Sequence, residues 1–199
     1  MKFRDKLWYI WEYYKLHMLG ILMIGIVIYI VGLSIHNRGI TSVLYGGIIN
    51  DYVTDSSLEA LTDEFKDRFA LDPKKQTVTM DASFYISMDQ QSEMSMSAST
   101  KLTVLIASQS LDFTISDPAV FESNAALDSF LDLEAFLPED LKSQLSEYFV
   151  YAKDNSGTEK AYGLDLSTSR YVTEGQSTLA APTMGVIANA PNPDSVVLF

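Results

Sequence analysis

The sequence predicts an α/β protein: one three-layer α/β domain with a mainly parallel sheet plus a β-hairpin, preceded by a single transmembrane helix. Three observations predict this class. Residues 18–35 carry no charged side chain. Residues 41–86 have the order strand, helix, strand, which is typical of a parallel α/β unit. Two strand-like runs, residues 147–152 and 159–166, flank a turn-rich segment typical of a hairpin.

The uncharged run, MLGILMIGIVIYIVGLSI, has the length and composition of a membrane span. At 1.5 Å per residue such a helix covers about 27 Å, close to the roughly 30 Å of hydrocarbon in a bilayer. A cleaved signal peptide is the alternative, because Gly32 and Ser34 have the small-x-small pattern of a cleavage site. The length of the run and its long aromatic leader favour the span.

Residues 1–17 form that leader, and the spacing of their apolar side chains predicts a cytoplasmic or interfacial amphipathic helix. Four basic side chains precede the span, so we expect a single-pass cell-membrane protein with a cytoplasmic N-terminus and an extracellular C-terminal domain. A docking helix for a membrane partner is the alternative. The aromatic side chains expected at headgroup depth in the lipid bilayer are Trp8, Tyr9, Trp11, Tyr13 and Tyr14.

Residues 39–199 are strongly acidic, with 24 Asp and Glu against 9 Lys and Arg, a net charge of −15. Such a domain repels nucleic acid, which we therefore exclude as an expected partner. The chain contains no cysteine, so its stability depends on an apolar core and not on disulfides. The length of this region suits one globular domain, and we expect residues 39–199 to form one extracytoplasmic α/β domain.

The first half of this domain alternates strands and helices. Residues 41–49 are β-branched and apolar, which predicts a first strand, and residues 58–69 have apolar side chains at helical spacing after a serine cap. A second strand is expected at residues 76–86, because strand-forming side chains alternate there. A polar loop at residues 87–100 and a helix at 101–108 follow.

The second half begins with a short strand at residues 111–115. Asp117 is then expected to cap a helix that has Pro118 in its first turn. The further elements expected are short helices at 119–124, 126–130 and 139–145, the hairpin, a flexible connection at 175–181, a strand at 183–189 and a helix after Asn192.

Four segments carry a family resemblance: KLTVLIASQSLDFTISDP at 101–118, residues 121–141 with Phe130, Leu131, Leu133 and Leu137, YGLDLSTS at 162–169 and GVIANAPNPDSVVLF at 185–199. Together with the order of elements, they resemble the first lobe of a type 2 extracytoplasmic solute-binding protein, the receptor class that serves ABC importers. The resemblance implies an α/β lobe with a binding role in transport. The chain differs from that family in having room for one lobe, and in carrying the predicted membrane helix in place of a lipidated cysteine.

Residues 39–199 contain neither His nor Cys, which removes Ser-His-Asp and Cys-His catalysis and ordinary zinc sites. The Ser-x-x-Lys spacing of serine-lysine hydrolases also fails, because Ala98 stands three positions before Lys101. We therefore expect no enzyme, no catalytic residue, no cofactor and no metal. The alternative is a Cu(I) site of Met88, Met94 and Met96, whose thioethers suit that ion but are also typical of ordinary packing.

A ligand site in an open α/β sheet is expected in the loops at the carboxyl ends of the parallel strands. Tyrosine side chains there can stack on a ligand and hydrogen-bond to it, although aromatic residues also pack cores. For Asp117, the role of a helix cap competes with ligand binding. The candidate ligand-binding residues are Tyr45, Gly46, Gly47, Phe84, Tyr85 and Asp117.

Two functions remain open at this stage. The first is a non-enzymatic, membrane-anchored extracytoplasmic domain that binds a small-molecule solute or a membrane-protein partner, as the resemblance to a solute-binding lobe implies. The second is a structural accessory subunit of a membrane protein complex without a small-molecule ligand. A polar cleft at the strand ends favours the first function, whereas an exposed apolar patch continuous with the aromatic leader favours the second.

Overall fold

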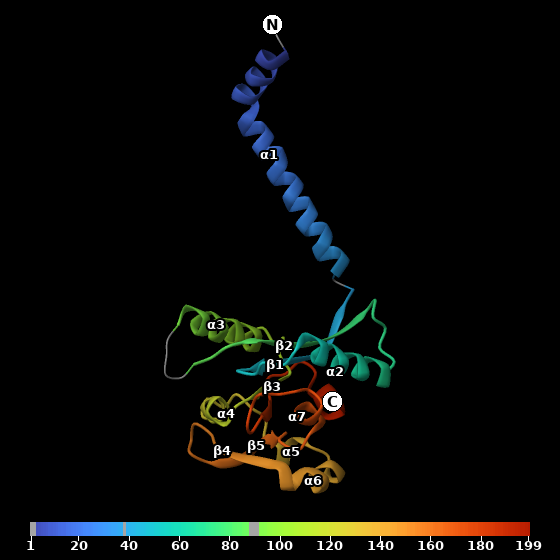
Figure 1. Cartoon of the computed structure of the whole chain (residues 1–199), viewed down its shortest axis with the longest axis vertical. Helices are drawn as coiled ribbons and strands as arrows, with labels where there is room; N and C mark the ends of the chain where they lie inside the picture. The colour runs from blue at the N-terminus through green and yellow to red at the C-terminus, as the bar shows by residue number, and fades with distance from the viewer. Residues whose placement is uncertain (1–2, 38, 88–91) are drawn as a thin grey trace. The chain divides into compact units, whose positions relative to one another are not determined.

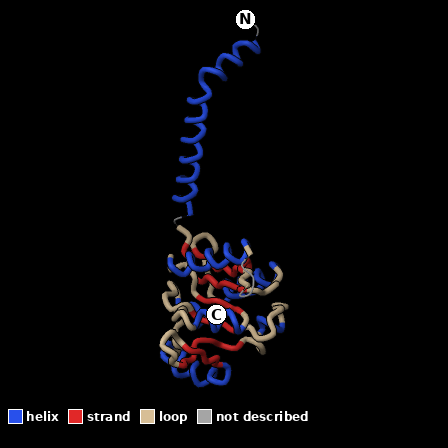
Figure 2. Tube along the Cα trace, turned by 90° about the vertical axis from the view of Figure 1, so that its left-hand side faces the viewer, coloured by secondary structure: helices blue, strands red, loops and turns tan. Residues whose placement is uncertain are grey.

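The computed structural model describes residues 3–37, 39–87 and 92–199, and in the first of these ranges it describes the side chains of Lys15 and residues 17–33. Contacts divide the chain into two compact units, Met1–Thr41 and Ser42–Phe199. The first unit consists mainly of one helix, and the second holds the sheet and the other helices (Figures 1 and 2).

Helix α1 extends over Phe3–Asn37. Within the described part of the chain, no helix is both long and apolar enough to cross a membrane. This finding overturns the predicted transmembrane helix at 18–35 and the single-pass cell-membrane localisation. The side chains of the predicted interface belt, Trp8, Tyr9, Trp11, Tyr13 and Tyr14, lie outside the described residues.

The second unit is built on one six-stranded sheet with the order β2-β1-β3-β6-β5-β4. β-Branched and aromatic side chains recur in most of its strands, because these side chains pack well on a pleated, half-buried surface. The strands are β1 (Thr41–Ile49), β2 (Gln76–Phe84), β3 (Phe113–Ser116), β4 (Phe149–Lys153), β5 (Glu159–Asp165) and β6 (Thr183–Val186).

The sheet is mixed, and the expectation of a mainly parallel sheet is wrong. Strands β1 and β3 pair in parallel, but β3–β6, β6–β5 and β5–β4 are antiparallel. The physical reason is that the chain turns back after β5 and forms β6 directly beside it, so that β6 runs antiparallel to β5. The predicted hairpin is confirmed as β4 and β5, and it extends this same sheet.

Helix starts follow local capping chemistry. Asp117 caps α4 as predicted, because its carboxylate accepts from the backbone N–H groups of Ala119 and Val120. Thr54 caps α2, which therefore begins before the predicted position. The helices are α2 (Asp55–Arg68), α3 (Glu93–Ala107), α4 (Pro118–Ala125), α5 (Leu133–Phe136), α6 (Glu139–Leu145), α7 (Arg170–Thr173) and α8 (Pro193–Leu198), with a 3-10 turn at Ser146–Tyr148.

Helices α5 and α7 were not predicted, and two further segments differ from the predicted elements. Helix α3 begins at Glu93, inside the stretch expected to be loop, because the Ser92 side chain accepts from the Ser95 N–H and caps it. The expected helix at residues 126–130 is absent from this described segment. Asp128 adopts a left-handed backbone with φ 55° there, which interrupts helical geometry.

Helices cover both faces of the sheet, so the α/β class with helical layers on either side is correct (Figure 1). On one face, here named the α2 face, side chains of α2, α5, α7 and α8 pack with Leu44, Phe113 and Ile115. On the other, the α4 face, side chains of α3 and α4 pack with Phe84 and Phe130.

Candidate functional site

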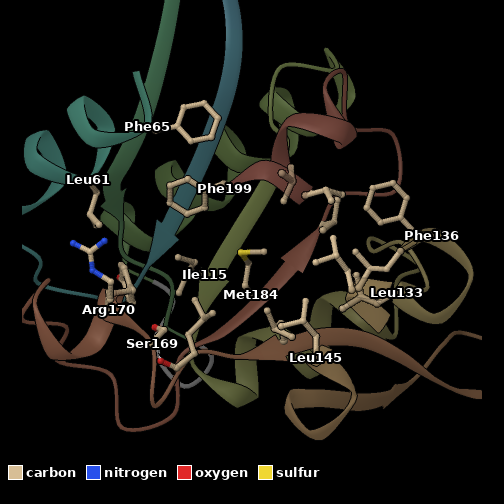
Figure 3. Close-up of a pocket in the computed structure, with 18 of the residues that line it drawn as sticks. Leu61, Phe65, Ile115, Leu133, Phe136, Leu145, Ser169, Arg170, Met184 and Phe199 are labelled. Carbon is tan, nitrogen blue, oxygen red and sulfur yellow. Dashed lines mark hydrogen bonds between the residues drawn. The ribbon is translucent and has the colours of Figure 1, made fainter. Parts of the chain in front are cut away.

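A cavity of about 440 Å³ lies on the α2 face of the sheet (Figure 3). Its lining from the sheet includes Ile115 of β3, Leu164 of β5 and Met184 of β6, and the rest comes from α2, α5, α6, α7, α8 and the adjoining loops. Small-molecule sites in proteins commonly measure about 300–1,000 Å³ and are mostly apolar. The cavity therefore has the size and the lining of a site for one small apolar molecule.

Short helices are the reason that this face contains a hollow. Helices α5 and α7 have four residues each and α6 has seven, and α6 contributes no buried residue. Pro138 separates α5 from α6, so the two cannot continue as one long helix. Such short helices do not present the continuous apolar stripe with which a longer helix fills the space above a sheet.

Polar side chains gather at one end of the cavity. Arg170 donates to Glu64 Oε1 at 2.8 Å, and to Glu174 through Nε at 3.0 Å and Nη2 at 2.8 Å. Arg68 Nη2 lies 3.3 Å from the same Glu64 oxygen. The hydrogen bonds from Arg170 lower the pKa of both Glu64 and Glu174, so the carboxylates stay ionised. In Figure 3, Arg170 and Ser169 lie opposite Phe136, across the apolar floor.

A buried carboxylate fixes one wall of the cavity. Asp51 accepts from the hydroxyls of Tyr171 and Ser177 at 2.6 Å each, and from the backbone N–H and hydroxyl of Thr178 at 2.7 and 2.8 Å. Burial alone would raise the pKa of Asp51, but these hydrogen bonds outweigh burial and hold it below the usual value. Since Tyr171 lines the cavity, Asp51 holds that wall in place.

Among the predicted site residues, Tyr45 joins a polar cluster between β1, β2 and α3. Its hydroxyl lies 3.1 Å from Asp81 Oδ2, and burial together with the Asp81 charge raises the pKa of Tyr45 to about 12. Of its neighbours, Gly46 has a packing role, whereas a Cβ at Gly47 would make only ordinary contacts, the nearest at 3.4 Å. A Cβ at Gly46 would lie 2.4 Å from the ring of Phe113, so only glycine allows that ring to approach the strand.

The same cluster brings a serine and a lysine together. Lys101 Nζ lies 2.9 Å from Ser83 Oγ and 2.6 Å from Asp81 Oδ2. An ammonium that donates to a carboxylate has no lone pair with which to activate a hydroxyl. The geometry therefore supports an ion pair that joins β2 to α3, and not a nucleophile with its base.

The other predicted residues are spread over different environments. Phe84 is buried, with the Lys101 ammonium 4.8 Å from its ring centre, and Tyr85 is 43% exposed. Asp117 combines its capping role with a hydrogen bond from Asn50 Nδ2 at 3.0 Å. The six predicted residues are all described and none lines the cavity, so a ligand site at the strand ends stays a prediction.

Sequence reasoning missed the cavity because its lining is dispersed. The lining runs from Leu61 on α2 to Phe199 after α8, and no local motif connects the contributing segments. A sequence signal for the cavity was Arg170, a basic residue without basic neighbours in an acidic domain. It identifies the polar end of the cavity only together with Glu64, which the fold brings beside it.

No metal site emerges from the described residues, in which no three potential His, Cys, Asp or Glu ligands gather. For the Cu(I) alternative, Met88 lies outside the described residues. Met94 and Met96 are exposed on α3 and stand two positions apart, so they point to different sides of that helix.

Comparison of the chain with protein-family models, with curated proteins and with solved structures finds no match. The function is therefore argued from the cavity and its chemistry.

Proposed function

We propose that residues 42–199 form a non-enzymatic binding domain whose cavity on the α2 face takes a small apolar molecule. The observation that carries this proposal is the cavity of about 440 Å³, lined by apolar side chains except at one end. Burial of apolar ligand surface is favourable in proportion to the area removed from water. Binding in this proposal is therefore driven by the cavity walls.

The surrounding chemistry supports binding over catalysis. Residues 39–199 lack the imidazole and thiol groups on which most nucleophilic catalysis depends. At the cavity itself, the charged groups are Glu64, Arg68 and Arg170, and both arginines pair with Glu64. The resemblance to a solute-binding lobe is a separate prediction that agrees with a binding role.

The test is isothermal titration of the full chain with 1-octanol as the probe. We expect one site per chain in the wild type, lost or weakened at least tenfold by Leu141→Glu, because this substitution places a carboxylate in the cavity lining. The matched control is Leu127→Glu, which makes the same change at a side chain that is 72% exposed and outside the cavity.

The control also separates the cavity from α1, because α1 is identical in all three proteins and any alcohol that it binds contributes equally to each titration. Equal binding by the wild type, Leu141→Glu and Leu127→Glu overturns the proposal. Near-ultraviolet circular dichroism of each variant establishes that it is folded before it is titrated.

A further inference from the structure

We propose that the molecule bound in this cavity is a single-chain amphiphile with an anionic head group, such as a medium-chain carboxylate. Its head group binds Arg68 and its alkyl chain occupies the apolar remainder of the cavity. This inference rests on the proposed function and names the chemical class of the ligand. Three features carry it: the polarity of the cavity from end to end, the unused hydrogen-bond donors of Arg68 at the polar end, and the cavity volume.

The cavity is polar at one end and apolar elsewhere. The charged and hydroxyl side chains of its lining come from two segments, Glu64 and Arg68 on α2, and Ser169 and Arg170 at the start of α7. The bond from Arg170 to Glu64 at 2.8 Å joins these segments, so the four side chains lie together. The remaining lining side chains are apolar apart from the hydroxyl of Tyr171, which is held by Asp51. A molecule that matches this surface has one polar end and one apolar body.

The hydrogen-bond donors at the polar end favour an anionic head group. Two guanidinium groups, those of Arg68 and Arg170, share the single oxygen Oε1 of Glu64. Arg170 is also held by both oxygens of Glu174, whereas Arg68 has one bond of 3.3 Å. A guanidinium carries five N–H donors, so Arg68 retains donors for a carboxylate that binds through two oxygens.

The charges at the polar end balance, because Arg68 and Arg170 stand against Glu64 and Glu174. With a net charge of −15 over residues 39–199, the overall field opposes the approach of an anion. An anionic head group is therefore held by direct contact with Arg68 and not by long-range attraction. The side chain of Arg68 is 60% exposed, so it can meet a head group that remains in contact with water.

The volume favours one alkyl chain. A cavity of about 440 Å³ is near the lower end of the range for small-molecule sites, about 300–1,000 Å³. The walls from Leu133 to Leu145 are aliphatic or aromatic and offer no polar partner along the chain. Each methylene buried there is expected to tighten binding about fourfold.

The experiment is calorimetric titration of the full chain with two homologous series, 1-alkanols and n-alkanoates of six to ten carbons, below their micelle concentrations. We expect the alkanoate to bind about tenfold more tightly than the alkanol of equal length. A difference of this size is what one charge-assisted hydrogen-bonded pair, here between the carboxylate and Arg68, contributes to binding. Arg68→Gln removes this preference, so that the alkanoate binds no more tightly than the alkanol of equal length. Lys66→Gln, on the same helix but outside the cavity lining, keeps the preference.

The outcomes separate this inference from the proposed function. If alkanol and alkanoate bind equally, or if the preference survives Arg68→Gln, the anionic head group is wrong while the apolar site stands. If 1-octylamine binds more tightly than octanoate, Glu64 is the head-group partner and the inference is also overturned. If no member of either series binds at a site sensitive to Leu141→Glu, the proposed function itself fails.

Discussion

The two faces of the sheet are packed in different ways. On the α4 face, aromatic rings fill recesses left by glycines: a Cβ at Gly163 would lie 2.6 Å from the ring of Phe121, and one at Gly185 would lie 2.6 Å from the ring of Phe130. These two rings stack with centroids 5.2 Å apart. On the α2 face, a hollow of about 440 Å³ remains.

The difference shows that the hollow is a local property and not loose packing of the whole domain. Protein interiors are normally packed to crystal-like density. The α4 face achieves this with aromatic rings against glycines, and the α2 face does the same at Gly46 and Phe113, away from the hollow. The α2 face is covered in part by short helices, and Asp51 adds hydrogen bonds to the apolar contacts of the wall at Tyr171. A face of this kind can hold a ligand without having to open first.

The largest expected effect comes from removing the carboxylate that holds the hollow face. Asp51→Ala leaves four donors on Tyr171, Ser177 and Thr178 without their acceptor, and we expect the free energy of unfolding to fall by about 3 kcal/mol. Urea unfolding followed by near-ultraviolet circular dichroism measures this, because residues 42–199 contain tyrosine and phenylalanine but no tryptophan.

The control for this variant is Asp63→Ala on the exposed surface of α2, where one ion pair with Lys66 is lost. Its effect is expected to stay within about 0.5 kcal/mol. Equal effects of the two substitutions would show that Asp51 does not hold the wall. Hydrogen bonding by a buried carboxylate would then not distinguish the α2 face from the α4 face.

A smaller effect is expected on the filled face. Gly185→Ala places a methyl group against the ring of Phe130, which is 4% exposed and stacked on Phe121, so the ring has no free space into which to move. We expect a loss of about 2 kcal/mol in the free energy of unfolding. Gly39→Ala, with nothing within 4 Å of its added Cβ, is the control, and a loss as small as in this control would contradict dense packing of the α4 face.

Local chemistry made part of this fold predictable. The strand Thr41–Ile49 and the helix Glu139–Leu145 have the predicted bounds, because an apolar β-branched run and a helical pattern after Pro138 are signals within a few residues. Asp117 was predicted as a helix cap for the same reason, since Pro118 follows it. Such signals need no knowledge of distant contacts.

Other features depend on contacts that no short segment encodes. The direction of β6 is set by its pairing with β3 and β5, and the predicted parallel order was wrong there. The start of α3 was missed because serines have weak helix propensity, although Ser95, Ala98 and Leu102 form a buried stripe.

The residues that form the candidate site likewise could not be predicted from short segments of the sequence. Glu64 and Arg170 are 106 positions apart in the chain, and their ion pair joins α2 to the start of α7. Tyr171 is likewise held by Asp51, which follows β1. Tertiary packing alone brings these groups together, so sequence patterns directed attention to the strand ends instead.

The smallest expected effect gives the sharpest comparison, because it uses one substitution on both faces. Val120→Leu adds a methylene at a side chain of the α4 face that is 2% exposed, and we expect the free energy of unfolding to fall by about 1 kcal/mol through overpacking. Val197→Leu adds the same methylene at the cavity wall, where space is available, and we expect a gain of up to about 0.8 kcal/mol.

Urea unfolding of both variants measures the signs of these two changes in the free energy of unfolding, and titration with 1-octanol should show weaker binding in Val197→Leu alone. Losses of similar size on both faces would mean that the hollow closes in solution, and the packing contrast would then disappear together with the binding site that depends on it.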